Sequence, residues 1–431
     1  MKVLFVSQSP VRREISSGNT FLNIFEGIDN IELASVYTRV GLPDSKISKA
    51  FCITEKDIIR SFFKGPPVGK VVTSLNASKD VNEKKILFKC DIMSLIKKMR
   101  PTVAFWLQNL IWKTGRWKKS ELDEFVKEYN PDIVFAAFSD SYFLNNLILY
   151  IKEISNAKLV MYSWDNNYTL KIVILSPLKW INHLINRKCM RKVARHIDLF
   201  YSISETQKTD YEADFKREIK ILTKGASFDI KPTFDISQNK PLKLVYTGNI
   251  GLNRWKTLAM IASALENINK NGIKAQMEIY TANEITDRIF KALNIEGVSR
   301  LMGSVSGDKV CEIQKNADIL IHVESADLKN RLIVRTSFST KLVDYFHQAK
   351  CIFAVGNSKV NSIYYLKEND AAVVATNNEE VKERLKWIID NPDLIREYGD
   401  KAWECGKRNH QIDKIQEMLM NDLRGIVQEN V

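Results

Sequence analysis

The residues best suited to chemistry lie in one stretch, 338–356, which reads FSTKLVDYFHQAKCIFAVG. Ser339 and Thr340 precede an amphipathic run and can cap a helix that begins beside Lys341. The free N–H groups and positive dipole at such a start favour an anion, so the stretch predicts a diphosphate site. Asp344, on the same predicted helix, can reach ribose hydroxyls. An ordinary capped helix with a solvated Lys and Asp also explains these residues.

A second stretch has the same order of elements. Residues 242–246 predict a buried strand, TGNIG at 247–251 a glycine loop, and 255–268 a helix. Loop N–H groups, together with Arg254 and Lys256 at the helix start, can hold a phosphate. The segment is too short for a Walker sequence, which would end in Gly-Lys-Ser/Thr. The alternative is a loop with surface cations.

Strands and helices alternate in both halves of the chain, which predicts an α/β protein with doubly wound parallel sheets. The loop 7–19 contains Gly18, which can let the backbone approach a ligand closely, but no Gly-x-Gly-x-x-Gly supports a dehydrogenase-type dinucleotide site. The loop 163–168 follows a predicted strand and carries Asp165. Loops at the carboxyl ends of strands hold ligands in open sheets, and a turn-forming role is the alternative for Asp165.

The stretch from 336 to 344 resembles the nucleotide-sugar site of retaining GT-B glycosyltransferases of the family 4-like group, which builds bacterial surface polysaccharides. Members of the group carry a Glu, then Gly-Phe-Gly, and a second Glu eight positions after the first. Here Thr336, Phe338, Ser339 and Asp344 stand at those positions. The Ser-Thr-Lys and Asp-Tyr form is similar to a capsule and O-antigen subgroup. Thr336 departs from the usual Glu, so that carboxylate's contact with the donor sugar is made otherwise or not at all.

The resemblance implies a GT-B architecture of two Rossmann-like domains facing a cleft. The expected segments are an acceptor-binding domain at 1–230, a linker at 231–241, a nucleotide-sugar-binding domain at 242–410 and a helix at 411–431 that crosses back to the first domain. The donor-binding residues that the resemblance implies are Gly248, Gly251, Ser304, Phe338, Ser339, Thr340, Lys341 and Asp344, with Ser304 near the nucleotide base. The catalytic candidates are Arg254, Lys256 and Asp165, and Gly18 and Asn19 lie in the first loop, which faces the cleft in this family.

The chemistry of sugar transfer is limited by the charge that develops on the departing phosphate, which a metal or fixed cations and N–H groups must stabilise. The sequence contains no Asp-x-Asp, the usual metal holder of the other major glycosyltransferase fold. We therefore expect a metal-independent enzyme of the hexosyltransferase class, with no cofactor beyond its nucleotide-sugar substrate. Retention of anomeric configuration is implied by the resemblance alone.

The charge of the chain points to an anionic partner, since its formal net charge is +13 over 431 residues. Two acid-free stretches, 97–119 and 171–196, each carry seven Lys or Arg around apolar and aromatic residues. Such segments suit a membrane interface, and a core helix with basic flanks is the alternative. No apolar run approaches the roughly 20 residues that cross a bilayer, and the first residues read as a strand rather than a signal peptide. The six cysteines lie far apart, without the spacing of a zinc site, and read as reduced thiols.

These observations predict a cytoplasmic glycosyltransferase, peripheral to the inner face of the cell membrane, that extends a lipid-linked saccharide for capsule, O-antigen or exopolysaccharide. A non-hydrolysing sugar-nucleotide epimerase shares the architecture but needs several cleft histidines, and the chain has five in all. A nucleic-acid-binding protein fits the charge but leaves the two anion sites unexplained, so no nucleic-acid partner is expected. A non-catalytic membrane-binding or scaffold module remains an alternative, because Thr336 replaces the usual Glu.

Overall fold

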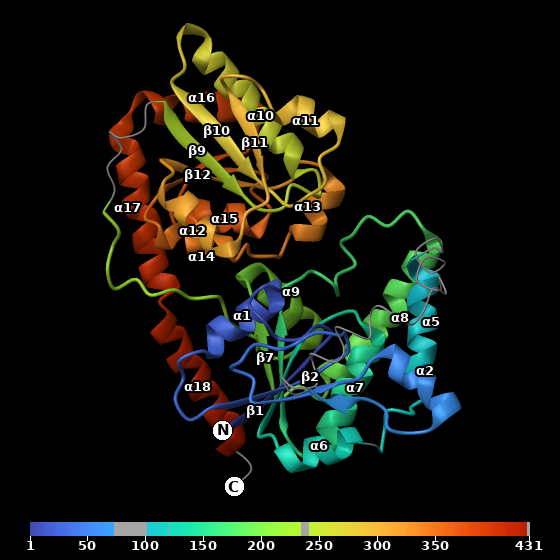
Figure 1. Cartoon of the computed structure of the whole chain (residues 1–431). Helices are drawn as coiled ribbons and strands as arrows, with labels where there is room; N and C mark the ends of the chain where they lie inside the picture. Colours follow the sequence, from blue (N-terminus) through green and yellow to red (C-terminus); the bar gives the residue numbers. More distant parts are fainter. Residues whose placement is uncertain (73–100, 120, 234–240, 429–431) are drawn as a thin grey trace. The chain divides into compact units, whose positions relative to one another are not determined.

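The computed structural model describes residues 1–72, 101–119, 121–233 and 241–428 and divides the chain into two compact units (Figure 1). The first unit comprises residues 1–170, 174–222 and the chain from 416 onward; the second comprises 171–173 and 223–415. Each unit is an α/β layer structure built on its own mainly parallel sheet. The predicted α/β class with two parallel sheets is therefore confirmed. Most of the predicted linker, at 234–240, lies outside the described residues.

The sheet of the first unit has, within the described residues, eight strands in the order β4-β3-β2-β1-β5-β6-β7-β8. Its strands are β1 (Lys2–Ser7), β2 (Glu32–Tyr37), β3 (Lys49–Cys52), β4 (Lys70–Val71), β5 (Ile133–Ala137), β6 (Lys158–Ser163), β7 (Leu199–Ser202) and β8 (Lys220–Ile221). All neighbouring strands pair in parallel except β3 with β4. The central strands are continuous apolar runs because helices cover both faces of a parallel sheet.

The helices of the first unit are α1 (Ser16–Phe25), α2 (Glu55–Lys64), α5 (Pro101–Lys113), α6 (Glu121–Tyr129), α7 (Tyr142–Ser155), α8 (Pro177–Ala194), α9 (Glu205–Phe215) and, from Gln416 onward, α18 (Ile412–Gln428). Asp422 ties α18 to this unit by accepting from the Tyr201 hydroxyl at 2.7 Å and the Lys220 ammonium at 2.6 Å. Ser204 caps α9, with its hydroxyl accepting from the backbone N–H of Gln207.

The sheet of the second unit has, over residues 241–415, six parallel strands in the order β11-β10-β9-β12-β13-β14. The strands are β9 (Leu242–Thr247), β10 (Ala275–Tyr280), β11 (Ser299–Gly303), β12 (Ile319–Val323), β13 (Cys351–Val355) and β14 (Val373–Ala375). The helices are α10 (Arg254–Ile268), followed by a 3-10 turn (Asn269–Asn271), then α11 (Asp287–Leu293), α12 (Gly307–Lys315), α13 (Leu328–Val334), α14 (Lys341–His347), α15 (Asn361–Glu368), α16 (Asn378–Asp390) and α17 (Pro392–Asn409). The strand that the sequence predicted at 242–246 is β9.

The first loop is shorter than the sequence predicted, because α1 begins at Ser16 rather than at Thr20. Gly18 therefore lies in the first turn of the helix, where a Cβ atom would come within 2.4 Å of the backbone N and O of Arg12. Phe21 on the same helix stacks on Phe5 of β1, with ring centroids 5.1 Å apart. The missing side chain lets α1 pack against its own preceding loop, which is a packing role that the sequence analysis did not predict.

The two acid-free stretches form helices α5 and α8 of the first unit, while residues 97–100 lie outside the described residues. The idea that the tryptophans of 97–119 reach a membrane surface is wrong for Trp112 and Trp117. Both are buried in the core, and Trp112 stacks on Phe143 of α7 at 4.8 Å. Phe105 stays exposed. No helix among the described residues is long and apolar enough to cross a membrane.

Candidate functional site

The most unusual polar group of the second unit is Glu324, a carboxylate that is only 4% exposed and follows β12 directly. Arg254, the first residue of α10, holds it: Nε and Nη2 of the guanidinium each lie 2.9 Å from Glu324 Oε2. β9 and β12 are adjacent parallel strands, so the loop after β9 and the residue after β12 meet at one edge of the sheet. Burial raises the pKa of Glu324, while the charges of Arg254 and Lys341 act in the opposite direction.

Lys341 is the second cation at this edge. Its side chain folds back over the ring of Tyr246, with Nζ 4.4 Å from the ring centroid, so it is not the solvated Lys of the alternative interpretation. Nζ also donates to the carbonyl of Thr247 at 3.4 Å. Burial lowers the pKa of Lys341 to about 7, with Glu324 opposing that shift and Arg254 adding to it. Arg254, Glu324 and Lys341 form the group that we call the basic cluster.

The glycine loop after β9 fits closely around the basic cluster. Gly248 has a φ of 138°, and a Cβ atom there would lie 3.4 Å from Lys341 Nζ. A side chain at this position would meet both backbone strain and the ammonium group. Gly248 therefore leaves the space above Lys341 open.

Two backbone N–H groups of the loop, which the sequence analysis offered to a phosphate, donate to side chains of the protein itself. Asn283 accepts from the N–H of Ile250 at 2.9 Å, and Asn249 accepts from that of Gly251 at 2.6 Å. At the start of α14, Thr340 occupies the N-cap position without a side-chain hydrogen bond, so the predicted capping is wrong. The side-chain cations Arg254 and Lys341 are therefore the positive groups that the structure places at this edge of the sheet.

Asp344 lies on α14 as predicted, and its carboxylate is paired with Lys224 at 2.5 Å. Lys224 was not identified from the sequence, because it is 120 residues away and precedes no regular element. Thr336 is buried, and the ring of Phe338 lies 5.1 Å from that of Tyr365 and 5.5 Å from that of His410. Phe338 thus packs inside the second unit and positions the 336–344 segment.

Two predicted residues lie away from the basic cluster. Lys256 is exposed, and its Nζ lies 5.7 Å from the centroid of the Trp255 ring. Ser304 is exposed and follows β11, the edge strand, which β10 and β9 separate from β12. The structure therefore brings together Arg254, Lys341 and Gly248, and it adds Glu324, which the sequence analysis missed.

The first unit has a separate pair of carboxylates. Asp140 follows β5 and Asp165 follows β6, and these two strands are parallel neighbours. Asp140 and Asp165 are both exposed at the surface. The surrounding protein atoms partly desolvate the Asp165 carboxylate and raise its pKa, and the charge of Asp140 raises it further. Partial desolvation also raises the pKa of Asp140. Asn19, a further candidate of this unit, is half-buried in α1, where its N–H donates to the carbonyl of Ile15.

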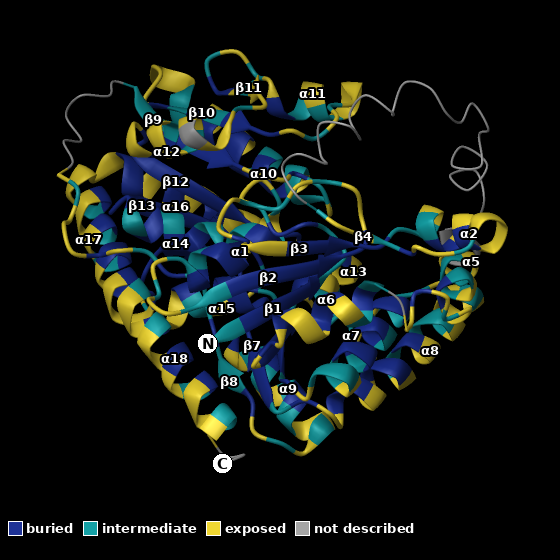
Figure 2. Cartoon of the chain, turned by 60° about the horizontal axis from the view of Figure 1, so that its bottom comes forward, coloured by how far each residue is buried: buried dark blue, intermediate teal, exposed yellow. Residues whose placement is uncertain are grey.

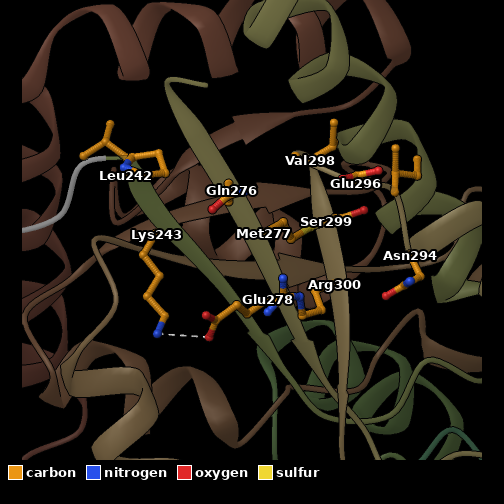
Figure 3. Close-up of a pocket in the computed structure, with 13 residues that line it drawn as sticks. Leu242, Lys243, Gln276, Met277, Glu278, Asn294, Glu296, Val298, Ser299 and Arg300 are labelled. Atoms are coloured by element: carbon orange, nitrogen blue, oxygen red, sulfur yellow. Dashed lines mark ion pairs between the residues drawn. The ribbon is translucent and has the colours of Figure 1, made fainter. Parts of the chain in front are cut away.

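Among the described residues the basic cluster contains no group of metal ligands, and a cavity of the second unit lies elsewhere. Within the described ranges, no three His, Cys, Asp or Glu side chains are grouped so that they could hold a metal ion. A cavity of about 520 Å³ in the second unit (Figure 3) lies at the beginning of β9, the opposite end of that strand from the basic cluster. Its lining includes Lys243 and Glu278, which form an ion pair at 3.0 Å. This self-contained pair leaves the cavity without a free charge from either residue.

Comparison with known proteins defines the fold. No protein-family model matches the sequence, and no curated protein matches it. Among solved structures, the chain is similar to Anabaena HepE in complex with UDP, at 12% identity and a TM-score of 0.63, over 99% of this chain and 100% of HepE. It is similar to the sucrose-phosphate synthase of Thermosynechococcus elongatus at 9% identity and a TM-score of 0.60, over 99% of both chains. It also matches a UDP-forming trehalose-phosphate synthase of Burkholderia vietnamiensis at 10% identity and a TM-score of 0.58, over 99% of this chain and all of that one.

The matches extend over whole chains, so they concern the complete two-unit architecture. The fold is the GT-B fold of nucleotide-sugar-dependent glycosyltransferases, and the fold prediction is confirmed.

Proposed function

We propose that this protein is a metal-independent, retaining glycosyltransferase that moves a sugar from a nucleotide-diphosphate donor to a lipid-linked saccharide acceptor. The observation that carries the donor half of the proposal is the convergence of Arg254 and Lys341 on Glu324. The GT-B fold supports it, and HepE has been solved with UDP and with UDP-glucose. UDP and UDP-sugars are therefore the first donors to test.

The basic cluster suits a diphosphate for electrostatic reasons. Two cations face one carboxylate, so the cluster carries a net positive charge when Lys341 is protonated. Arg254 uses Nε and Nη2 on Glu324, which leaves its remaining N–H donors for phosphate oxygens. These groups are fixed by packing before the donor binds, so they can stabilise the charge that develops on the leaving diphosphate without reorganising.

Two carboxylates complete the assignment of roles. Asp344 is 44% exposed beside Lys224, and we assign it to the ribose hydroxyls of the donor. Asp165, whose pKa is raised by partial desolvation and by Asp140, is assigned to the acceptor hydroxyl as a hydrogen-bond acceptor or base. The carboxylate that the basic cluster holds comes from Glu324, whereas position 336 supplies a buried threonine.

The biological setting that we infer is the synthesis of a surface polysaccharide on the inner face of the cell membrane. The resemblance of the 336–344 segment to capsule and O-antigen enzymes supports this setting, and so does the formal charge of +13. An epimerase is less favoured, because the two synthases named above transfer sugars and are not epimerases.

The test is calorimetric titration of the protein with UDP, UDP-glucose, GDP and ADP in the presence of EDTA. We expect one nucleoside diphosphate or its sugar to bind, and binding to weaken strongly in Arg254→Lys and Lys341→Met. Lys256→Met is the matched control, since it removes an exposed cation from the same helix as Arg254 and is expected to bind normally. If no nucleotide binds, the donor proposal fails. If binding and transfer require an added divalent metal, the metal-independent mechanism fails.

A further inference from the structure

Three neighbouring helices of the first unit expose apolar side chains where a soluble surface would carry polar ones. On α2, Ile59, Phe62 and Phe63 are exposed, and Phe63 is 85% accessible. The same i, i+3, i+4 spacing recurs on α8 with Ile181, Leu184 and Ile185, which are all exposed. On α5 the exposed apolar residues are Phe105, Leu107 and Leu110. Both α2 and α8 thus bury one side in the protein and present a second apolar stripe to solvent. The exposed apolar residues of α5 lie on more than one side of that helix, because Phe105 and Leu107 are two positions apart.

Specific contacts hold the three helices side by side. Gln108 and Trp112 of α5 both donate to Glu55 Oε1 of α2, at 2.7 and 2.9 Å. Trp106 of α5 donates from its indole nitrogen to Asn182 of α8 at 2.9 Å. Figures 1 and 2 show α5 beside both α2 and α8. The exposed side chains of these three adjoining helices are together called the α2/α5/α8 face.

The polar residues of the α2/α5/α8 face are mostly cations. Its exposed basic side chains are Lys56, Arg60, Lys64, Lys113, Lys179 and Lys188. Neither α5 nor α8 contains an acidic residue. The acids of α2 are turned inward, because Glu55 accepts from α5 and Asp57 forms the capping box with Thr54. The face is therefore apolar and uniformly positive.

We propose that the α2/α5/α8 face is the surface by which this protein binds an anionic lipid bilayer. The apolar stripes would enter the headgroup region while the cations around them meet lipid phosphates, which is how an interfacial element binds. The choice of a bilayer as the partner of this face rests on the proposed function, since a lipid-linked acceptor lies in such a bilayer. Compared with the membrane segment expected from the sequence, the proposed surface includes α2, which the sequence analysis did not single out. Its apolar residues include Phe62, Phe63 and the exposed leucines rather than the buried Trp112 and Trp117.

Charge distribution favours a bilayer over other occupants. A nucleic acid uses cations and stacking rings, but it gains little from the leucine and isoleucine side chains that dominate α5 and α8. A second copy of the chain would bring two faces of the same positive sign together. An anionic membrane is complementary to both the apolar and the basic parts of the face.

The experiment measures flotation of the full-length protein with vesicles of phosphatidylcholine alone, or with about one third phosphatidylglycerol, at low and high salt. We expect binding to the anionic vesicles only and weakening by salt, because each cation near the surface contributes roughly a fivefold gain. The variant Phe63→Ser, Leu110→Ser, Leu184→Ser should lower the partition coefficient by at least roughly tenfold. Phe290→Ser is the matched control, because Phe290 is an exposed ring on α11 of the second unit.

Equal binding to neutral and anionic vesicles, no binding to either, or equal binding by the triple variant and the wild type would overturn the proposal. It is also overturned if the triple substitution abolishes RNA binding or a self-associated state while vesicle binding is unchanged. Titration with UDP in the absence of vesicles separates this proposal from the donor proposal. Normal vesicle binding without any nucleotide binding supports the membrane proposal and refutes the proposed glycosyltransferase function. Nucleotide binding without vesicle binding refutes only the membrane proposal.

Discussion

Arg254 donates from Nε to Oε2 of Glu324 at 2.9 Å, and its Nη2 forms an ion pair with the same oxygen at 2.9 Å. The ion pair opposes the rise in the pKa of Glu324 that burial causes, and it holds the guanidinium plane fixed. Arg254→Lys retains a cation but loses the planar pair of donors. We expect it to lower kcat/KM for the donor by about 10²- to 10³-fold, as when one preorganised donor is removed from a transition state. Steady-state kinetics with the best donor check this expectation.

Measurements of stability separate the structural role of Arg254, which is to pair with Glu324, from its role in activity. Arg254→Ala leaves Glu324 buried without its partner, so we expect it to lose roughly 3–5 kcal/mol of stability as well as activity. Arg254→Ala with Glu324→Gln should recover part of the stability and none of the activity. Full activity in Arg254→Lys, or a loss of the same size in Lys256→Met, would contradict the assignment.

Lys341 predicts proton uptake on donor binding. Burial lowers its pKa to about 7, so above pH 7 the free protein holds it largely uncharged. A diphosphate favours the ammonium form and raises its pKa again, so binding at pH 8 takes up close to one proton, and affinity falls by up to about tenfold per pH unit above 7. Calorimetry of UDP binding in two buffers of different ionisation enthalpy measures the uptake. Lys341→Met should abolish the uptake; the same uptake in the variant would rule Lys341 out as its source.

Much of the second unit can be predicted from the sequence, because short-range patterns of apolar and polar residues mark its strands, loops and helices. The apolar runs locate the strands, and the strand-loop-helix order places Arg254 and Gly248 at the end of β9. Lys341 follows from the 338–356 stretch in the same way. Its inward orientation does not, because it depends on Tyr246 from another strand.

The residues that the sequence analysis missed become functional through distant partners. Glu324 reads as one polar residue after a strand, and its burial depends on Arg254, 70 positions earlier. Lys224 acquires a role only from Asp344, and Asp140 only from the pairing of β5 with β6. The sequence left open whether Trp112 and Trp117 lie at a membrane surface or in the core, because composition does not tell the two sides of a helix apart when both are apolar.

Gly18 predicts a packing effect on stability rather than on ligand binding. A Cβ atom at this position would lie 2.4 Å from the Arg12 backbone, so Gly18→Ala must displace α1 or its preceding loop. We expect a loss of about 1–3 kcal/mol in stability with unchanged UDP affinity of the folded protein. Gly425→Ala on α18 is the control, since nothing lies within 4 Å of its added Cβ. Thermal unfolding compares the two, and equal midpoints would refute the packing argument.

His410 predicts that acid destabilises the protein. Burial lowers its pKa to about 4, whereas an unfolded histidine titrates near 6.5. Between these values the unfolded chain binds a proton that the folded chain excludes. The contribution is therefore complete above about pH 6.5, and up to about 3 kcal/mol is lost as the pH falls to about 4.

The same environment indicates which His410 nitrogen carries the proton. Nδ1 lies 3.3 Å from the carbonyl of Lys224, which can only accept, so Nδ1 donates, and Nε2 accepts from the Tyr365 hydroxyl at 3.0 Å. The free energy of unfolding, measured with urea between pH 4.5 and 7, should depend less steeply on pH in His410→Gln. The difference in slope should correspond to about one proton. The exposed His196→Gln serves as control, and an unchanged slope in His410→Gln would assign the effect elsewhere.

Substitution of Asp165 is expected to lower turnover without weakening donor binding. Asp165 follows β6 beside Asp140, and partial desolvation together with that neighbouring charge raises its pKa, which makes its carboxylate a better base toward an acceptor hydroxyl. We expect Asp165→Asn to lower kcat by about 10²- to 10⁴-fold while UDP affinity stays within about twofold. Asp140→Asn should instead lower the apparent pKa of the acid limb of the kcat profile, because it removes the charge that raises the pKa of Asp165. A kcat for Asp165→Asn within error of wild type would leave Asp165 as a turn residue only. An unshifted acid limb in Asp140→Asn would show that the two carboxylates are not coupled.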